Sequence, residues 1–399
     1  MNGYKLSLLW FMALLVFFLS GCGGGGGDSS APPGTLGVSI TDAPSCGFEA
    51  VNITVSKVRV HQSASAGEGD AGWAEIILTP ARKINLLDLT NGALEELGQT
   101  PLAAGHYTQL RLVLDSNTGS SLANSIVLQG TTEEIPLVTP SAVQSGIKLI
   151  NEFDVVSEER VDLVLDFDAC TSVVKAGERY ILKPVVKVIP TVLNGINGFV
   201  DVFSSADNVT VSAQQNGTVI RSTVPNTITG EFFLARLEPG NYDVVFTADG
   251  RTTKVIATVP VASETSITPL STSAAPITLP VSTTTPTFRT ISGTVTLNPL
   301  NSEEVAQVTA KQTLGISPTV TVKSRAADLS DGTYALALPF DAPLLGLYGT
   351  GILPIAFSAH PLETGLYAVE ASATGYATVS ADADISTVDA IINFTLLLP

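Results

Sequence analysis

Histidine and cysteine are scarce in this chain, which has three of each among its 399 residues. These are the groups that acid–base catalysis and transition-metal binding use most. His61, His106 and His360 are isolated in sequence, and each is expected to be a half-exposed strand residue rather than a base or a ligand. The sequence also lacks GxSxG, HExxH, CxxC and Walker motifs, and it has no GxGxxG motif after a strand. These absences favour a non-enzymatic protein.

Basic residues are also few: 20 lysines and arginines stand against 37 acidic residues, which gives a net charge of −17. Such a balance argues against nucleic acid as a partner, because the phosphates would be repelled. Aromatic residues make up only 6% and charged residues 14%. Valine and threonine, which favour strands, are abundant, and so are glycine and proline, which favour turns. This composition is typical of an all-β, extracytoplasmic protein.

The amino-terminal segment has one long apolar run, Leu6 to Leu19. Fourteen helical residues rise about 21 Å, which is short of the roughly 30 Å hydrocarbon core of a bilayer, so a signal peptide is favoured over a membrane span. The following Leu19-Ser20-Gly21-Cys22 resembles a bacterial lipobox, whose cysteine is acylated with palmitate-like chains and becomes the new amino terminus. The alternative is a plain signal peptide with an incidental cysteine. By analogy with sorting rules, Gly23 after the cysteine favours the outer membrane.

The chain is expected to contain three β domains behind this signal. The predicted segments are a lipoprotein signal peptide (1–21), a Gly-rich flexible tether (22–33), a first β domain (34–190), a second (196–261), a Ser/Thr/Pro-rich linker (262–287) and a third β domain with an insertion (288–399). The linker has no apolar period, and its prolines predict an extended spacer. The predicted fold class is therefore all-β, with three β-sandwiches in tandem.

Short alternating runs in residues 34–190 predict strands, with a bulge near Ser56-Lys57 where the apolar spacing changes from odd to even. Only TNGALEELG, residues 90–98, is predicted to be helical, with Asn91 as cap and Gly98 as stop. With Cys22 carrying lipid, Cys46 and Cys170 remain and are expected to form a disulfide in an oxidising compartment. Two buried free thiols are the alternative.

Several motifs of the first domain carry a resemblance to a known family. GTLGVSITDAP, VNITVSKVRVH, INLLDLTNG, LGQTPLAAGHYTQLRLVL, QSGIKL and VLDFDAC followed by LKPV occur in that order. Together they resemble the bacterial lipoprotein family known as domain of unknown function 4382, over about residues 34–190. The resemblance implies a secreted β-rich module and brings no known activity, substrate or catalytic residue.

The second and third domains form an internal repeat. Gly198 matches Gly293, Phe232 matches Tyr334, Tyr242 matches Tyr367 and Gly250 matches Gly375, and an apolar insertion, about 344–364, interrupts the third domain as a hairpin or loop. The pattern GxFxLxxLxPGxYxVxFxAxG resembles the carboxypeptidase-regulatory-like, prealbumin-like sandwich, a fold grouped with starch-binding-like domains. That resemblance implies a carbohydrate-binding-like fold.

Paired acids are the leading candidates for a site. Asp166 and Asp168 are two apart on a predicted strand, and with Asp42 they are expected to bind calcium, which prefers several oxygen ligands. The simpler alternative is a solvated acidic face. A second and weaker cluster is Asp382, Asp384 and Asp389.

The leading functional hypothesis is a lipid-anchored, non-enzymatic binding or scaffolding module of a bacterial cell envelope, with the membrane, a glycan or other envelope proteins as partners and no cofactor beyond the calcium suggested above. The first alternative is carbohydrate binding, for which Trp73 and Tyr107 are candidate stacking residues, whereas Tyr242, Tyr334 and Tyr367 fall where a core would take them. A carboxylate-based hydrolase is a remote alternative, because nothing in the sequence predicts the cleft that it needs.

Overall fold

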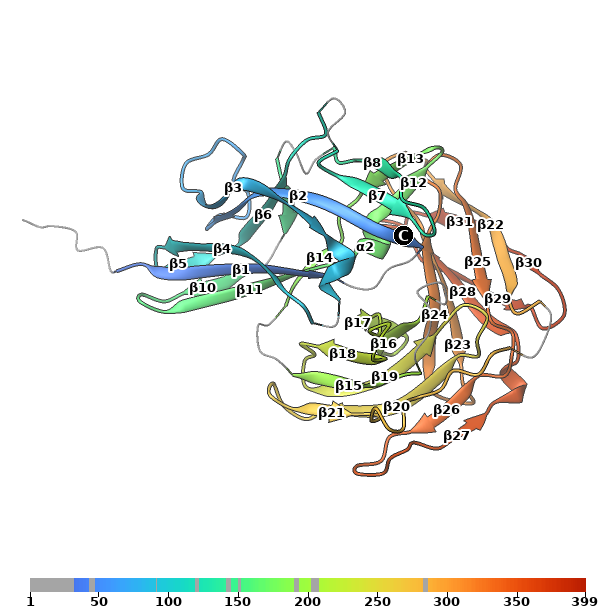
Figure 1. Ribbon diagram of the computed structural model, residues 1–399. Helices are drawn as coiled ribbons and strands as arrows, with labels where there is room; N and C mark the ends of the chain where they lie inside the picture. The colour runs from blue at the N-terminus through green and yellow to red at the C-terminus, as the bar shows by residue number, and fades with distance from the viewer. Residues whose placement is uncertain are drawn as a thin grey trace, which may run out of the picture.

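The chain folds into three β-sandwich domains, here numbered from the amino terminus. The structure, a computed structural model, describes residues 32–42, 47–90, 92–118, 122–140, 145–149, 152–189, 194–201, 208–282 and 286–399. Domain 1 (34–189) lies at the upper left of Figure 1, domain 2 (194–282) below it, and domain 3 (286–399) at the right. The predicted all-β class with tandem sandwiches is confirmed.

Domain 1 consists of two main sheets around one core. The smaller sheet has the order β14-β11-β1-β4 and the larger β12-β13-β8-β7-β2-β6-β9, with β3 also paired to β2. Its elements are β1 Gly34–Asp42, β2 Phe48–His61, β3 Ala74–Asn85, η1 Leu86–Leu89, β4 Glu95–Leu102, β5 Gly105–Tyr107, β6 Gln109–Leu114, β7 Ser125–Leu128, β8 Glu134–Val138, β9 Ile147–Leu149, β10 Phe153–Val155, β11 Arg160–Phe167, α2 Ala169–Ser172, β12 Val173–Ala176, β13 Arg179–Leu182 and β14 Val186–Ile189.

The apolar alternation in the sequence explains this core. Leu36, Val38 and Ile40 of β1 are buried, as are the apolar residues of β2 on the inner face of the other sheet. Both neighbours of β2 shift register between Val55 and Lys57, so the predicted bulge is confirmed. The bulge keeps apolar side chains inward on both sides of the shift, because one extra residue restores the two-residue period.

The helix predicted over residues 90–98 is wrong, apart from Asn91, which lies outside the described residues. Residues 95–102 form β4, which pairs antiparallel with β1, and Leu97 points into the core. Gly98 has a φ of +133° beside a register shift, so it serves a strand irregularity rather than a helix end. Pairing with β1 outweighs the local helix preference of Ala93-Leu94-Glu95-Glu96 because helix propensity is a weak prior.

Domains 2 and 3 share one strand topology, as the internal repeat predicts. Domain 2 has sheets β18-β15-β21 and β17-β16-β19-β20, and domain 3 has β25-β22 with β30 and β31, and β24-β23-β28-β29. The strands of domain 2 are β15 Gly195–Phe199, β16 Thr210–Gln215, β17 Thr218–Thr223, β18 Glu231–Ala235, β19 Gly240–Thr247, β20 Lys254–Val261 and β21 Ile267–Pro269. Those of domain 3 are β22 Arg289–Asn298, β23 Gln307–Thr313, β24 Thr319–Ala326, β25 Thr333–Leu338, β28 Leu366–Ser372, β29 Val379–Asp384, β30 Ala390–Ile391 and β31 Phe394–Leu397.

The matched tyrosines of the repeat stabilise equivalent corners. The hydroxyl of Tyr242 donates to the carbonyl of Glu238, four residues upstream, at 2.7 Å. The hydroxyl of Tyr367 donates to the carbonyl of Pro339, which lies 28 residues upstream. The insertion of domain 3 therefore lies between the acceptor and the donor of this corner, and the hydrogen bond is still formed. Similar tyrosine corners occur in other β-sandwiches.

The insertion itself forms a hairpin that joins the neighbouring domain. It contains β26 Leu344–Leu347, β27 Phe357–Ala359 and the short η3 Pro361–Glu363. β26 pairs parallel with β20 of domain 2, so that the hairpin extends the sheet of domain 2 rather than that of domain 3. Figure 1 shows β26 and β27 beside β20 at the bottom of the molecule. The hairpin expectation is confirmed, and its attachment to domain 2 is new.

The predicted extended spacer, 262–287, is wrong for its described part. β21 pairs parallel with β15, and Ile277 forms an isolated bridge to Val200. Three apolar residues of this segment are buried in the core of domain 2: Leu270, Ile277 and Leu279. Three buried residues with spacings of seven and two positions give no sustained strand or helix period, which is why the sequence pattern does not reveal them.

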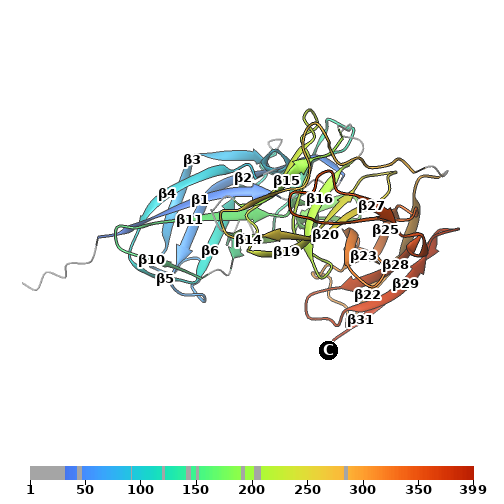
Figure 2. The same ribbon diagram turned by 90° about the horizontal axis from the view of Figure 1, so that it is seen from below.

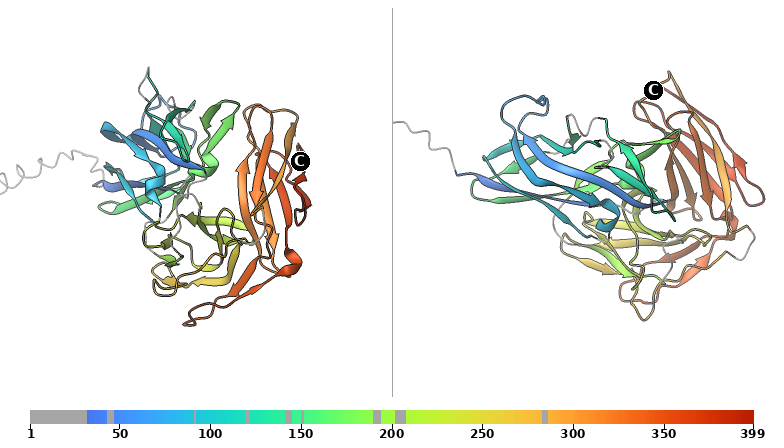
Figure 3. Two further views of the ribbon diagram at one scale, coloured as in Figure 1. Left: turned by 45° about the vertical axis from the view of Figure 1, so that its right-hand side comes forward. Right: turned by 45° about the horizontal axis from the view of Figure 1, so that its top comes forward.

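The three domains contact one another pairwise. Domains 2 and 3 share a core cluster, because Val245 and Val255 of domain 2 pack with the buried residues of domain 3. Domain 3 reaches domain 1 through Leu329, whose amide donates to the carbonyl of Lys175 at 3.0 Å. Domain 1 meets domain 2 through an ion pair described below. Figures 2 and 3 show the resulting triangular arrangement from three further directions.

Candidate functional site

The acids singled out by the sequence lie where domain 1 meets domain 2, and this contact region is called the seam. β1 and β11 run parallel, with Asp42 opposite Phe167, so both strands bring their carboxyl ends to the same edge. Domain 2 contributes Arg221 of β17 and Arg236, which follows β18. Thr41, Asp42, Asp166, Arg221 and Arg236 line one small cavity there. The seam is therefore polar on both sides.

The central contact of the seam is an ion pair between Asp166 and Arg221. The side chains of both residues are more than nine-tenths buried, at 8% and 9% exposure. Burial raises the pKa of Asp166, while the charge of Arg221 opposes this shift. A buried pair of this kind is costly to break, because removing one partner leaves the other charge buried without compensation. The pair is therefore a contact between the two domains that is costly to lose.

The other two predicted calcium ligands have separate structural roles. Asp42 accepts a hydrogen bond from the amide of Ala169 at 2.9 Å. Asp168 caps α2 by accepting from the amide of Thr171 at 3.0 Å. Within the part of the chain that the structure describes, no group of three or more His, Cys, Asp or Glu residues is arranged to hold a metal ion. The calcium prediction is wrong for these residues, because Asp166 is paired with a cation and Asp168 is turned to a helix terminus.

The cavity in the seam is small. It leaves about 10 Å³ for the centre of a water molecule, close to the least space that holds one water. Oδ1 of Asp166 and Nε of Arg236 are buried beside it without a hydrogen-bond partner in the described structure. Arg236 adopts a φ of +59° and donates from Nη1 to the carbonyl of Gly92 at 3.2 Å. The arrangement suits one bridging water.

Cys22 and Cys46 lie outside the described residues, and Cys170 is the second residue of α2. The hydrogen bond from Ala169 to Asp42 brings the segments after β11 and β1 side by side. Such proximity is what a bridge between Cys46 and Cys170 requires. The disulfide stays a prediction, as do the signal peptide and the tether, which also lie outside the described residues.

The aromatic residues give little support to sugar stacking by the sandwich cores. Tyr242, Tyr334 and Tyr367 are buried, so the expectation that they belong to the core is confirmed. Tyr107 is only 4% exposed and stacks on Phe153 with 5.4 Å between ring centroids, so it is not a free platform for a ligand. Of the two candidates in domain 1, Trp73 is the one at the surface, where it is half-buried.

The remaining candidate groups are dispersed. His61 lies in β2, His106 in β5 beside Asp154, and His360 directly before η3. In the weaker acidic cluster, Asp384 accepts from the amide of Ser386 and Asp389 from that of Thr290. The described residues contain no helix of the length and hydropathy that crossing a bilayer requires.

Sequence reasoning missed Arg221 and Arg236, the two basic residues of the seam. Each is a single arginine in a strand-rich context, and nothing in the local pattern distinguishes it from a solvated side chain. Their role depends on how domain 2 docks on domain 1, which is set by tertiary structure. The sequence offers one signal for them. Basic residues are scarce, with 20 lysines and arginines in the chain, so each one is a candidate partner for the more numerous acids.

The chain is distantly similar to several solved structures. The TIE protein of Bacillus anthracis is 13% identical with a TM-score of 0.18, and the match covers 92% of this chain and 51% of that one. The major pilin SpaA of Corynebacterium diphtheriae is 10% identical with a TM-score of 0.20, covering 91% and 100%. A streptococcal ancillary pilin is 9% identical with a TM-score of 0.17, covering 92% and 99%. The chain thus spans about half the length of the first of these, and likeness at this level carries no argument about function.

The sequence comparisons identify domain 1 alone. No curated protein matches the chain. Residues 33–184 match a family model described as a domain of unknown function, DUF4382, which confirms the resemblance drawn from the motifs of the first domain.

Proposed function

We propose that this chain is a non-enzymatic structural or binding module of a bacterial cell envelope, held at a membrane by lipid on Cys22. The observation that carries the proposal is the closed packing of the three domains, which makes them one body. The lipid anchor is supported by the Leu19–Cys22 motif, and the outer membrane by Gly23. Several acyl chains together hold a protein on a bilayer durably.

The interdomain contacts support a structural role because they are buried and of several kinds. Gln214 of domain 2, only 1% exposed, donates from Nε2 to the carbonyl of Thr321 in domain 3 at 2.8 Å. Its Oε1 accepts from the amide of the same residue at 2.7 Å. With the Asp166–Arg221 pair and the β20–β26 pairing, these contacts hold the domains in one orientation.

The acids of the seam support a non-enzymatic role. Asp42 holds the amide of Ala169, Asp166 is neutralised by Arg221, and Asp168 caps a helix. Each carboxylate therefore has a structural partner, whereas a general acid or nucleophile must face a substrate. The proposed Cys46–Cys170 bridge would fasten the same edge of domain 1.

The anchor is tested by membrane fractionation of cells that express the wild type or Cys22→Ser. We expect the wild type in the outer-membrane fraction, released only by detergent, and the variant in the soluble fraction. Mass spectrometry of the wild-type amino terminus should show acylated Cys22. An unprocessed or unacylated terminus, or a variant that stays in the membrane fraction, contradicts the anchor.

The rigid packing is tested by small-angle X-ray scattering on the soluble Cys22→Ser protein. A compact body of this length has a radius of gyration of about 21 Å, and a chain of separate domains is larger. We expect a value near the compact limit, and an increase for Arg221→Met. Lys83→Gln is the matched control, because its ion pair with Glu134 is exposed and worth little. A large radius for the wild type contradicts the packed arrangement.

A further inference from the structure

The outer face of the larger sheet of domain 1 carries a row of charged side chains from four adjacent strands. Glu75 of β3 lies opposite Arg59 of β2, Arg59 opposite Arg111 of β6, and Arg111 opposite Lys148 of β9. Three neighbouring members, Arg59, Arg111 and Lys148, are positive, although the chain has a net charge of −17. These three residues are called the cationic row. Like charges directly opposite each other destabilise a sheet, so the row needs a physical reason.

A loop of eleven residues, 62–72, lies over the cationic row and is called the strap. Its backbone carbonyl oxygens accept hydrogen bonds from the side chains beneath. The donors and acceptors are Lys148 Nζ to Ala64 (2.6 Å), Arg111 Nη2 to Ala66 (2.8 Å), Trp73 Nε1 to Gly67 (2.9 Å) and Arg59 Nη1 to Glu68 (3.1 Å). The oxygens of the strap thus occupy the places that the oxygens of a ligand would take.

Arg111 is the buried cation of the row. It is 7% exposed, and its hydrogen bonds go to neutral oxygens: the carbonyls of Ala66 and of Ser145, the latter at 2.8 Å, and the side-chain oxygen of Gln109 in the amide orientation that satisfies both groups. Glu75 pairs instead with Arg59 at 2.6 Å and with Lys57 at 3.3 Å. Among the described residues no carboxylate lies within 4 Å of the charged groups of Arg111 or Lys148. Buried charges in proteins are normally paired, so this guanidinium lacks an anion.

The strap is held by hydrogen bonds rather than by apolar packing. Its sequence QSASAGEGDAG has no large apolar residue, and Ala66 is its one buried residue. It also carries two of the three acids near the row, Glu68 and Asp70. Lys57 and the three cations of the row give four positive charges, and Glu68, Asp70 and Glu75 give three negative charges. The formal charge of this face is therefore +1 with the strap in place and +3 without it. Displacing the strap therefore exposes little apolar surface, and it uncovers a strongly positive face.

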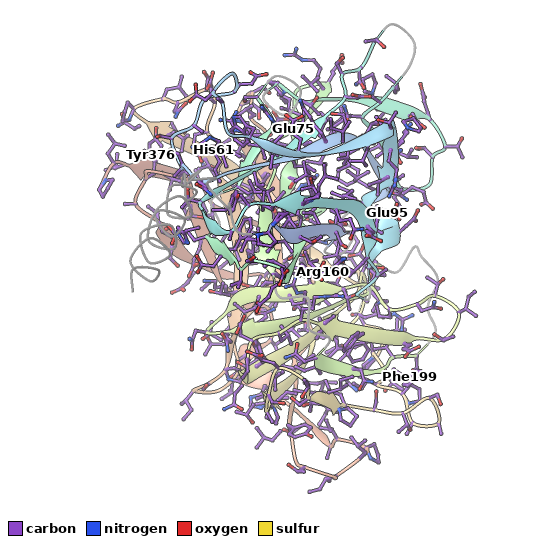
Figure 4. All side chains as sticks on the ribbon, turned by 90° about the vertical axis from the view of Figure 1, so that its left-hand side faces the viewer. His61, Glu75, Glu95, Arg160, Phe199 and Tyr376 are labelled. Atoms are coloured by element: carbon purple, nitrogen blue, oxygen red, sulfur yellow. The ribbon has the colours of Figure 1, made fainter. Side chains whose placement is uncertain are left out.

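We propose that this face of domain 1 binds an acidic polysaccharide, which displaces the strap. Guanidinium groups bind carboxylates bidentately, and a row of cations one strand apart suits a polymer with repeated carboxylates. Trp73, whose ring lies 4.5 Å from Arg59 and 4.9 Å from Arg111, supplies an aromatic surface beside the charges. In Figure 4, His61 and Glu75 on these strands lie in the upper part of the view, and Phe199 of domain 2 lies in the lower part. The site goes beyond the proposed function and requires neither the lipid nor the seam.

The test is calorimetric titration of the soluble Cys22→Ser chain with oligogalacturonate at low salt, with a neutral oligoglucan as control ligand. We expect binding of the acidic ligand alone, tightened about tenfold in a strap-deleted variant that lacks residues 63–70 and with them the acceptors of Lys148 and Arg111. Lys148→Gln should weaken binding about tenfold, as loss of one charge-assisted hydrogen bond implies. Arg111→Gln should weaken it further, and Lys83→Gln, on β3 but outside the row, should leave it unchanged.

Exposed Lys148 carries the test if the buried Arg111 variant fails to fold, which circular dichroism reports. The proposal is overturned if neither the wild type nor the strap-deleted protein binds oligogalacturonate. It is equally overturned if the neutral glucan binds as well, or if Lys148→Gln binds like the wild type. Binding to phosphatidylglycerol vesicles but not to the oligosaccharide would replace the polysaccharide with a lipid headgroup and so also reject the proposal.

Discussion

The carboxylate of Asp328 makes one of the contacts between domain 3 and domain 1. Its Oδ1 accepts from the amide of Gly177 at 3.1 Å and from the hydroxyl of Ser330 at 2.6 Å, while Lys175 lies 3.7 Å from Oδ2. Burial by itself raises the pKa of Asp328, but the hydrogen bonds from Ser330 and Gly177 together outweigh it and hold the pKa below its usual value. The ionised form is therefore favoured in the folded protein.

Asp328→Asn should remove a pH dependence of stability. Because the folded pKa lies below the unfolded one, the carboxylate stabilises the fold above about pH 3.9, and this contribution disappears as the pH falls through the folded pKa. We expect the variant to unfold at lower urea concentration than the wild type near pH 7 and at a similar concentration near pH 2. The amide should be tolerated, since Asn226 occupies the corresponding turn of domain 2 and accepts the amides of Ile228 and Thr229.

The control for this prediction is Asp331→Asn in the same turn. Asp331 accepts hydrogen bonds from Thr333, within domain 3, at 2.9 Å and 2.7 Å. Its substitution should lower stability without changing the contact to domain 1. If Asp328→Asn and the wild type show the same slope of stability against pH, the ionised carboxylate does not stabilise the interface.

At the scale of elements, the β26–β27 hairpin of domain 3 should stabilise domain 2. It covers the edge of β20, and the ammonium of Lys254 lies 4.2 Å from the centre of the Phe357 ring. Replacing residues 344–359 with a short Gly-rich turn removes four half-buried apolar side chains: Leu345, Tyr348, Ile355 and Phe357. At roughly half the value of full burial for each, the loss is about 3–6 kcal/mol.

Hydrogen exchange is the measurement that locates this effect. The amides of β20 that pair with β26 should exchange faster in the hairpin-deleted protein, because an uncovered sheet edge frays and opens locally. The Tyr367 corner should survive, since its acceptor, Pro339, precedes the deletion. Unchanged protection of β20 would mean that the hairpin merely lies on the sheet.

The same elements show what the sequence could and could not reveal. The alternating strands of domain 1 and the bulge at Ser56-Lys57 follow from a two-residue period, and the repeat follows from matched glycines and tyrosines. β4 was hidden because its local preference is helical while its pairing with β1 is distant in sequence. The pairing of β26 with β20, and of Arg221 with Asp166, joins residues of different domains, and no local pattern encodes such contacts.

At the scale of the whole molecule, the contacts between domains differ in kind. Domain 1 meets its neighbours through polar groups, namely the Asp166–Arg221 pair and the Asp328 cluster. Domains 2 and 3 share apolar core, a strand pairing and the buried amide of Gln214. An interface that buries apolar surface couples folding more strongly than a small polar one, because its loss exposes part of each core.

Domains 2 and 3 should therefore unfold as one cooperative unit, although the repeat in the sequence suggests two. Differential scanning calorimetry should show one transition for the two together, with calorimetric and van't Hoff enthalpies of about 140 kcal/mol, and a separate transition for domain 1. Gln214→Ala leaves the amide and carbonyl of Thr321 buried without these partners, at about 1–3 kcal/mol each, so it should lower the shared transition temperature. Separate transitions for domains 2 and 3 in the wild type would show that the shared core does not couple their unfolding. The hairpin would then contact domain 2 without linking the stability of the two domains.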